Sequence, residues 1–214
     1  MFDRSVRIPL LVKVTYTGFL CILVPIYWRD YGPSVFLWFS DIALFTVLLA
    51  LWLESCLLGS MAAVGALVFT LGWNLDILTG GSALGLVDYM FDPALPLYLR
   101  GFSLYHVVLL VMLLWLPYRL GYDPRAVTAQ CVLMCLVLLL SYLVAEPSEN
   151  INWVFGPEEP QTLVHPLVYL GLLMIALPVL VCLPTHYVLM LLFGKRAGTE
   201  TLAELRQLLG ARER

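Results

Sequence analysis

The segment "AVTAQCVLMCLVLLLSYLVA", residues 126–145, decides the class of fold. It contains no charged side chain, and about 20 consecutive, predominantly apolar residues form an α-helix long enough to cross the hydrocarbon core of a bilayer. The whole chain has the same character, because its 214 residues are 61% hydrophobic and only 13% charged, whereas soluble domains carry about 25% charged residues. The sequence therefore predicts an integral membrane protein.

Five further apolar segments flank this one, so the sequence predicts six membrane spans. Backbone polar groups in lipid must be satisfied internally, and the period-2 pattern of a barrel is absent, so we expect an all-α polytopic membrane helix bundle. Pro178 and Pro184 should kink or break the long last span, although a split into a seventh span is disfavoured. The second and third spans are joined by a tight hairpin at "ESCLLGS". The predicted spans are 8–27, 33–53, 57–77, 101–120, 126–145 and 163–193.

The basic residues predict the orientation of the bundle. Six spans place both termini and the second and fourth loops on one side, and most of the arginines lie there, whereas Arg29 and Arg100 lie on the other. The excess of positive charge predicts that both termini are cytoplasmic. We expect residues 1–197 to form the transmembrane bundle and residues 198–214 a cytoplasmic amphipathic helix. The compact loops and the lack of a transit sequence suit a bacterial inner membrane.

The five cysteines and three histidines do not predict a metal or cofactor site. No cysteines form a CxxC pair, and the histidines lack the H-E-x-x-H or H-x-x-x-H spacing of a zinc site. Cys131 and Cys135 share a helix face, but no histidine or carboxylate accompanies them in the sequence. We interpret the cysteines as small packing residues, and we expect no metal and no cofactor.

Asp41, in "FLWFSDIALF" (residues 36–45), is a carboxyl group inside a predicted span, which costs a few kcal/mol unless it has a partner or a purpose. At a rise of about 1.5 Å per residue it lies about 12 Å below the outer face. Most of the other polar residues of the spans gather in the same outer half, which predicts a polar cavity open to the outer leaflet. The inner half offers Glu54, Gln130 and the pair Thr185 and His186. Asn74, Asp76 and His165 lie near an interface, so helix capping is the simpler interpretation for them. The residues of this outer half are Ser40, Asp41, Asn74, Asp76, His106, Asn152 and His165.

The chemistry that these residue types suggest is acyl transfer or hydrolysis. An imidazole beside a carboxylate can deprotonate a hydroxyl, so we assign His106 as the general base, Asp41 as its orienting group and Ser40 as the nucleophile. Ser103, at i,i+3 from His106, is the other hydroxyl. The chain has no G-x-S-x-G elbow. For substrate binding we expect hydrogen bonds from Asn74 and Asn152 to an oxyanion, with further contacts from Ser103, Trp153 and His165.

Two segments resemble a known family. "GFSLYHVVLLVMLLWLPYRLGYD" (residues 101–123) is similar to the segment that carries the essential histidine in the androgen-induced and androgen-dependent TFPI-regulating proteins, and "FLWFSDIALF" is placed like their threonine-bearing segment. The layout also resembles related TMEM-type acyltransferases, whose asparagine-rich turn before the last helix is similar to "ENINWVFG". The resemblance implies a six-helix membrane lipid hydrolase with His106 in the catalytic site. No threonine stands in "FLWFSDIALF", so the nucleophile does not carry over directly.

The predicted function is therefore an intramembrane lipid hydrolase or acyltransferase acting on an amphiphilic ester. Two alternatives stay open: a transporter or binding protein for a small ligand or ion, with Asp41 as the charge site, and a non-enzymatic membrane assembly partner. The expected partner is a membrane lipid or lipophilic small molecule rather than a nucleic acid. The sequence does not predict an oligomeric state.

Overall fold

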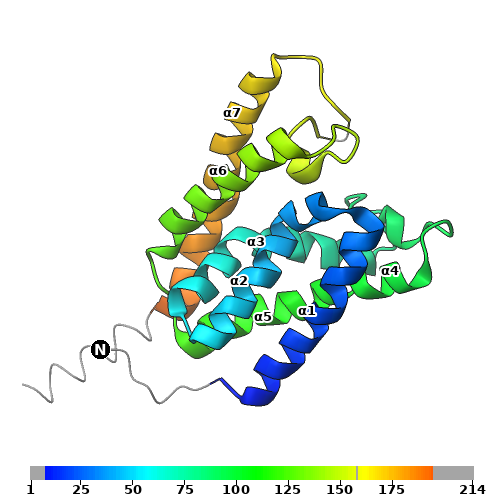
Figure 1. The fold of residues 1–214 in the computed structure, drawn as a ribbon. Helices are drawn as coiled ribbons and strands as arrows, with labels where there is room; N and C mark the ends of the chain where they lie inside the picture. The colour runs from blue at the N-terminus through cyan, green and yellow to red at the C-terminus, as the bar shows by residue number, and fades with distance from the viewer. Residues whose placement is uncertain (1–7, 158, 195–214) are drawn as a thin grey trace, which may run out of the picture.

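The computed structural model describes residues 8–157 and 159–194, and within them it shows the predicted all-helical membrane bundle (Figure 1). Among the described residues, five helices are long and apolar enough to cross a membrane. A sixth, α2, is apolar but shorter, and the 3₁₀ helix η1 precedes it. The main helices are α1 (Leu10–Tyr31), α2 (Phe39–Leu53), α3 (Cys56–Leu78), α4 (Leu97–Ser103), α5 (Tyr105–Leu120), α6 (Ala126–Val144) and α7 (Pro166–Leu177). The short ones are η1 (Pro33–Leu37), η2 (Asp88–Met90), η3 (Ile151–Trp153) and the π-helical η4 (Pro178–Cys182).

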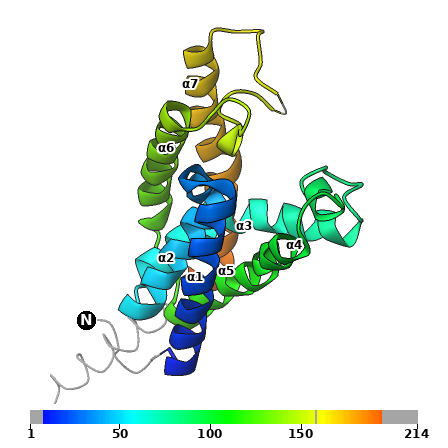
Figure 2. The same ribbon diagram turned by 45° about the vertical axis from the view of Figure 1, so that its right-hand side comes forward.

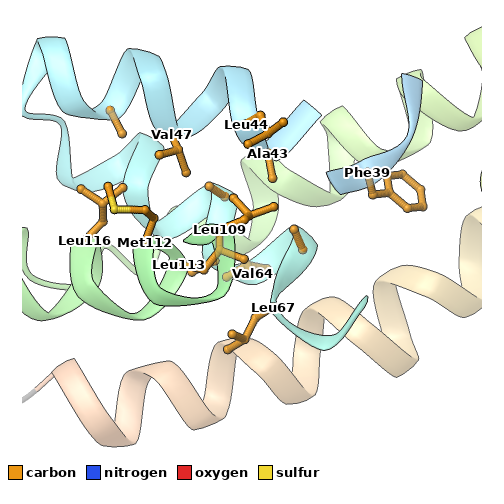
Figure 3. Close-up of a cluster of buried hydrophobic side chains, with 14 of the residues drawn as sticks. Phe39, Ala43, Leu44, Val47, Val64, Leu67, Leu109, Met112, Leu113 and Leu116 are labelled. Carbon is orange, nitrogen blue, oxygen red and sulfur yellow. The ribbon is translucent and has the colours of Figure 1, made fainter. Parts of the chain in front are cut away.

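Helix α3 is the centre of the bundle and packs on α2, α5 and α6. Small residues let neighbouring helices approach α3 closely, as is usual in membrane bundles: a Cβ added at Gly59 would lie 3.2 Å from Cβ of Leu116 on α5. Figure 3 shows the apolar side chains of α2, α3 and α5 turned toward one another, among them Val47, Val64 and Leu113, each less than 1% exposed. This core fixes the relative positions of the three helices that carry the candidate site.

The predicted hairpin between the second and third spans is present and is stabilised by polar contacts. Glu54 ends α2 in the left-handed conformation, with φ of 49°, and the Ser55 side chain accepts a hydrogen bond from the backbone N–H of Leu58, as an N-cap does. Lys13 of α1 forms an ion pair with Glu54 at 2.7 Å. The ion pair connects α1 to the hairpin.

The last span is not broken at its prolines. Helix α7 passes into a π-helical turn at Pro178–Cys182 and continues as helix to Gly194. Pro178 has no N–H to donate to the carbonyl of Met174, and a π turn accommodates such a defect without ending the helix. The thiol of Cys135 on α6 donates to that carbonyl, with Sγ and O 3.6 Å apart. A split into seven spans is therefore not seen.

Helices α6 and α7 form a pair on one side of the bundle, and α1 lies on another (Figures 1 and 2). In Figure 2 the end of α3 and α5 that carries α4 diverges from the α6–α7 pair. The predicted amphipathic helix at residues 198–214 lies outside the described residues, as do both termini. The cytoplasmic placement of the termini stays a prediction.

Candidate functional site

The candidate site lies where α2 begins, α3 ends and α5 begins, with α1 alongside. We call it the polar cluster. Helices α2 and α5 each deliver polar side chains from their first turn, and α3 delivers them from its last turns, so all come from the same end of the bundle, as the depth argument predicts. The polar cluster consists of Tyr27, Ser40, Asp41, Trp73, Asn74, Tyr89, Ser103, Tyr105 and His106.

Asp41 is the buried centre of the polar cluster, with only 3% of its surface exposed. The hydroxyl of Tyr105 lies 3.3 Å from Asp41 Oδ2 and 3.1 Å from Ser40 Oγ. A tyrosine has one proton and can donate fully to only one of them. Asp41 Oδ1 is buried, and it has no hydrogen-bond partner in the part of the chain that the structure describes.

The expected hydrogen bond between Asp41 and His106 is not formed in this structure, because Asp41 bonds to Tyr105 instead. The level of the two residues in the bundle was inferred from the helix rise, but successive residues point about 100° apart around a helix. Tyr105 is the residue that faces α2, and His106 turns toward α3. The side chain of Tyr105 therefore takes the place that the sequence analysis gave to the imidazole.

His106 is held in one tautomer by its backbone contact. Its Nδ1 lies 2.9 Å from the carbonyl oxygen of Ser103, and a carbonyl can only accept, so Nδ1 carries the proton and Nε2 keeps its lone pair in the neutral ring. The ring lies between those of Trp73, at 4.5 Å, and Tyr105, at 4.1 Å between centroids. This stacking fixes the imidazole plane.

Neither serine is bonded to the His106 side chain. The Ser103 hydroxyl donates to the carbonyl of Leu99 at 3.1 Å and lies 3.3 Å from the Tyr27 hydroxyl, whereas Ser40 is in contact with Tyr105. A Ser–His pair in hydrogen-bond contact is therefore not formed.

The amide donors assigned to an oxyanion are already used within the protein. Asn74 Nδ2 donates to the carbonyls of Thr70 and His106, at 2.8 and 3.1 Å. Asn152 closes the break between η1 and α2: its Oδ1 accepts from Phe39 N at 3.0 Å and its Nδ2 donates to Leu37 O at 2.7 Å. Both amides thus have structural roles in this arrangement.

The remaining residues near this end also have structural roles. Asp76, fully buried, accepts hydrogen bonds from four backbone N–H groups of the loop at residues 83–87. His165 is exposed and caps α7 by accepting from the N–H of Leu167, which is the simpler interpretation given above. Trp153 packs on Trp38 and Phe69, with centroid distances of 5.8 and 5.7 Å. It does not join the polar cluster.

Much of the polar cluster is buried, since Asp41, Ser103 and Tyr105 are 3%, 4% and 5% exposed. The structure has a narrow crevice at Gly65 and Gln130 and an apolar groove on α6 and α7, and neither is lined by Asp41 or His106. The predicted polar cavity corresponds to neither of these two hollows.

Three tyrosines of the polar cluster were not predicted from the sequence. Tyr105 stands next to His106 in "FSLYH" and bonds to Asp41, and Tyr27 contacts Ser103. Tyr89, in the loop after α3, accepts a hydrogen bond from Trp73 Nε1 at 2.9 Å, and burial raises the pKa of Tyr89. A tyrosine in an apolar segment resembles an interfacial belt residue, so the sequence offered little to mark these three.

The other end of the bundle holds a smaller polar contact between Tyr122 and His186, whose hydroxyl oxygen and Nδ1 are 2.6 Å apart. Nearby in the sequence, Thr185 is buried with its hydroxyl oxygen unpaired within the described chain. No group of three or more histidine, cysteine or acidic side chains among the described residues could hold a metal ion.

Comparisons with known proteins add no assignment. No family model matches the chain, and no curated protein or solved structure matches it either. The polar cluster is therefore the feature from which a function can be proposed.

Proposed function

We propose that this membrane-helix bundle binds a proton, or a small cationic or hydrogen-bond-donating ligand, at Asp41. The observation that supports this proposal is the buried Oδ1 of Asp41, which no described residue contacts by a hydrogen bond. Leaving a buried polar group unpaired costs about 1–3 kcal/mol, and more for a charged group. Side chains in membrane spans that carry such a cost usually have a function.

The neighbours of Asp41 suit such a site. Tyr105 donates to Oδ2 or to Ser40, and its ring is held by stacking on His106. Oδ2 thus has the Tyr105 hydroxyl within hydrogen-bond distance, while Oδ1 offers a lone pair to a donor. Protonation or a bound cation would neutralise the carboxylate where a free charge is costly.

The experiment is infrared spectroscopy of the purified protein in lipid, following the C=O stretch of protonated carboxyl groups as pH is varied. We expect a titrating band that disappears in Asp41→Asn and persists in Asp30→Asn, the exposed matched control. Tyr105→Phe should shift the band because it removes the hydrogen bond to Oδ2. If neither pH nor added monovalent and organic cations produce a signal that depends on Asp41, the proposal fails.

A second candidate is the predicted lipid hydrolase or acyltransferase, favoured by two observations. Tyr105 connects Asp41 to the hydroxyl of Ser40, which is the candidate nucleophile. Nε2 of His106, the candidate general base, keeps a lone pair that can accept a proton. Ser40 Oγ would form an acyl ester, its proton would leave with the alcohol of the substrate, and water would release the acid.

A fluorophosphonate probe tests this second candidate, with the labelled residue mapped by mass spectrometry. Activity predicts labelling at Ser40 that is lost in Ser40→Ala and His106→Ala but kept in Ser103→Ala. Labelling that is absent from a folded sample, or unaffected by Ser40→Ala, would exclude it. A membrane lipid as partner and a bacterial inner membrane as location belong to this proposal.

A further inference from the structure

A second site lies away from the polar cluster, on the paired helices α6 and α7. A groove of about 310 Å³ runs between them. Its wall is apolar, with two cysteine thiols and one thioether as the sulfur-containing groups. The lining residues are Cys131, Val132, Cys135, Leu136 and Leu139 of α6 and Met174 of α7.

The groove lies at the depth of lipid tails. Cys131 is five residues and Leu139 thirteen residues beyond Ala126, the first residue of α6, so at 1.5 Å per residue they lie about 8 and 20 Å from that end. The hydrocarbon core of a bilayer is about 30 Å thick. At this depth the available occupants are lipid chains and other membrane helices.

The local sequence explains the groove. Cysteines on α6 leave more space than leucines would, and Cys135 turns its thiol to the carbonyl of Met174, which Pro178 cannot satisfy. The π turn that begins at Pro178 lies next to this contact. The groove thus lies at the contact between α6 and α7, next to the irregular segment η4.

The shape of the groove distinguishes the two occupants. Helix–helix contacts in membranes use small residues that let backbones approach, but Val132 and Leu136 on the groove are large and more than half exposed. A helix about 10 Å in diameter would rest on these side chains and leave the groove empty, whereas a single hydrocarbon chain can enter it. We propose that the groove binds one acyl chain of a phospholipid as a defined lipid site.

The test uses liposomes of phosphatidylcholine that contain a minor fraction of phosphatidylcholine with a diazirine on one acyl chain. After irradiation, cross-linked residues are mapped by mass spectrometry. Leu136 and Ile22 are similarly exposed, at 59% and 57%, but Ile22 lies on α1 outside the groove. We expect labelling at Leu136 and Met174 several-fold above labelling at Ile22.

Two variants complete the experiment. Cys135→Phe fills the groove and should reduce labelling at Met174 to the level of Ile22, whereas Cys21→Phe, the same substitution at an exposed cysteine of α1, should leave it unchanged. Labelling that follows exposure alone in the unaltered protein, with Leu136 equal to Ile22, would overturn the proposal even if Cys135→Phe does not fold. The site is independent of Asp41, so its failure would leave the proposed function untouched.

Discussion

The contact between α3 and α6 gives a prediction whose size can be derived from the structure. A Cβ added at Gly65 would overlap Nε2 of Gln130 and would lie 2.5 Å from its Cδ and 3.0 Å from its Cγ. Ordinary van der Waals contact begins at 3.4 Å, so most of the Gln130 side chain would have to move by about 1 Å. Gln130 is only 5% exposed, and overpacking of this kind costs about 1–3 kcal/mol.

Alanine is itself favoured over glycine inside a helix by about 0.5–1 kcal/mol. The difference between the two effects leads us to expect that Gly65→Ala lowers the free energy of unfolding by up to about 2.5 kcal/mol. In the Gln130→Ala background the overlap is gone, so the same substitution should raise that free energy by about 0.5–1 kcal/mol. Gly65→Ala is therefore destabilising in the unaltered protein and stabilising in the Gln130→Ala background, so the coupling energy between Gly65 and Gln130 can be measured.

Reversible unfolding in mixed micelles with increasing SDS, followed by circular dichroism, measures all four members of the cycle. Gly18→Ala is the matched control, because Gly18 lies within α1 and has no atom within 4 Å of the added Cβ, so it should be neutral or stabilising. If Gly65→Ala were as stable as Gly18→Ala, or if Gln130→Ala did not change its effect, the close packing of Gln130 of α6 on Gly65 of α3 would be refuted.

Three further predictions concern single polar residues. Asn152→Ala removes the bonds to both sides of the η1–α2 break and should lower the free energy of unfolding by about 2–3 kcal/mol, measured by the same SDS titration; an unchanged stability would contradict the capping role. Asp76→Asn keeps one acceptor oxygen in place of two, so amide hydrogen exchange at residues 83–87 should accelerate while exchange in α6 stays as before. Arg125 holds the pKa of Asp123 below its ordinary value through its hydrogen bonds. A lowered folded-state pKa stabilises the protein above the unfolded value of about 3.9, and this contribution of about 1 kcal/mol or less is lost as pH falls through the folded pKa. Arg125→Gln should therefore flatten the acid limb of the stability–pH curve, and an unchanged limb would exclude the pair as its cause.

The spans could be predicted because length and apolar composition suffice for a helix in lipid. Their depth gave the level of each polar residue, which placed Asp41 and His106 at the same end of the bundle. Which side chains meet depends on helix rotation, and rotation is set by packing against neighbours, which one sequence does not reveal. Tyr105 and His106 show the consequence. They are adjacent on α5 but point in different directions, so that Tyr105 bonds to Asp41 in place of the predicted His106.

Pro178, which directly follows α7, shows a second limit of prediction from the sequence. Pro178 removes a hydrogen bond, which the sequence reveals, but the outcome depends on whether a neighbour can satisfy the carbonyl of Met174. The thiol of Cys135 approaches that carbonyl from another helix, and the π turn takes up the remaining distortion. The sequence predicts a kink or a break at the prolines, whereas tertiary contacts maintain a continuous helix that contains a π turn.

The two buried aspartates of this end differ in how their carboxylate oxygens are satisfied. Asp76 and Asp41 are both almost fully buried, at 0% and 3% exposure. The loop at residues 83–87 turns four backbone N–H groups to Asp76, which is how a fold stabilises a carboxylate that serves its own architecture. Asp41 has the hydroxyl of Tyr105 on one oxygen and no bonded donor among the described residues on the other. Among the described residues, Asp76 thus has four donors and Oδ1 of Asp41 has none, and this contrast supports the proposed proton or ligand at Asp41.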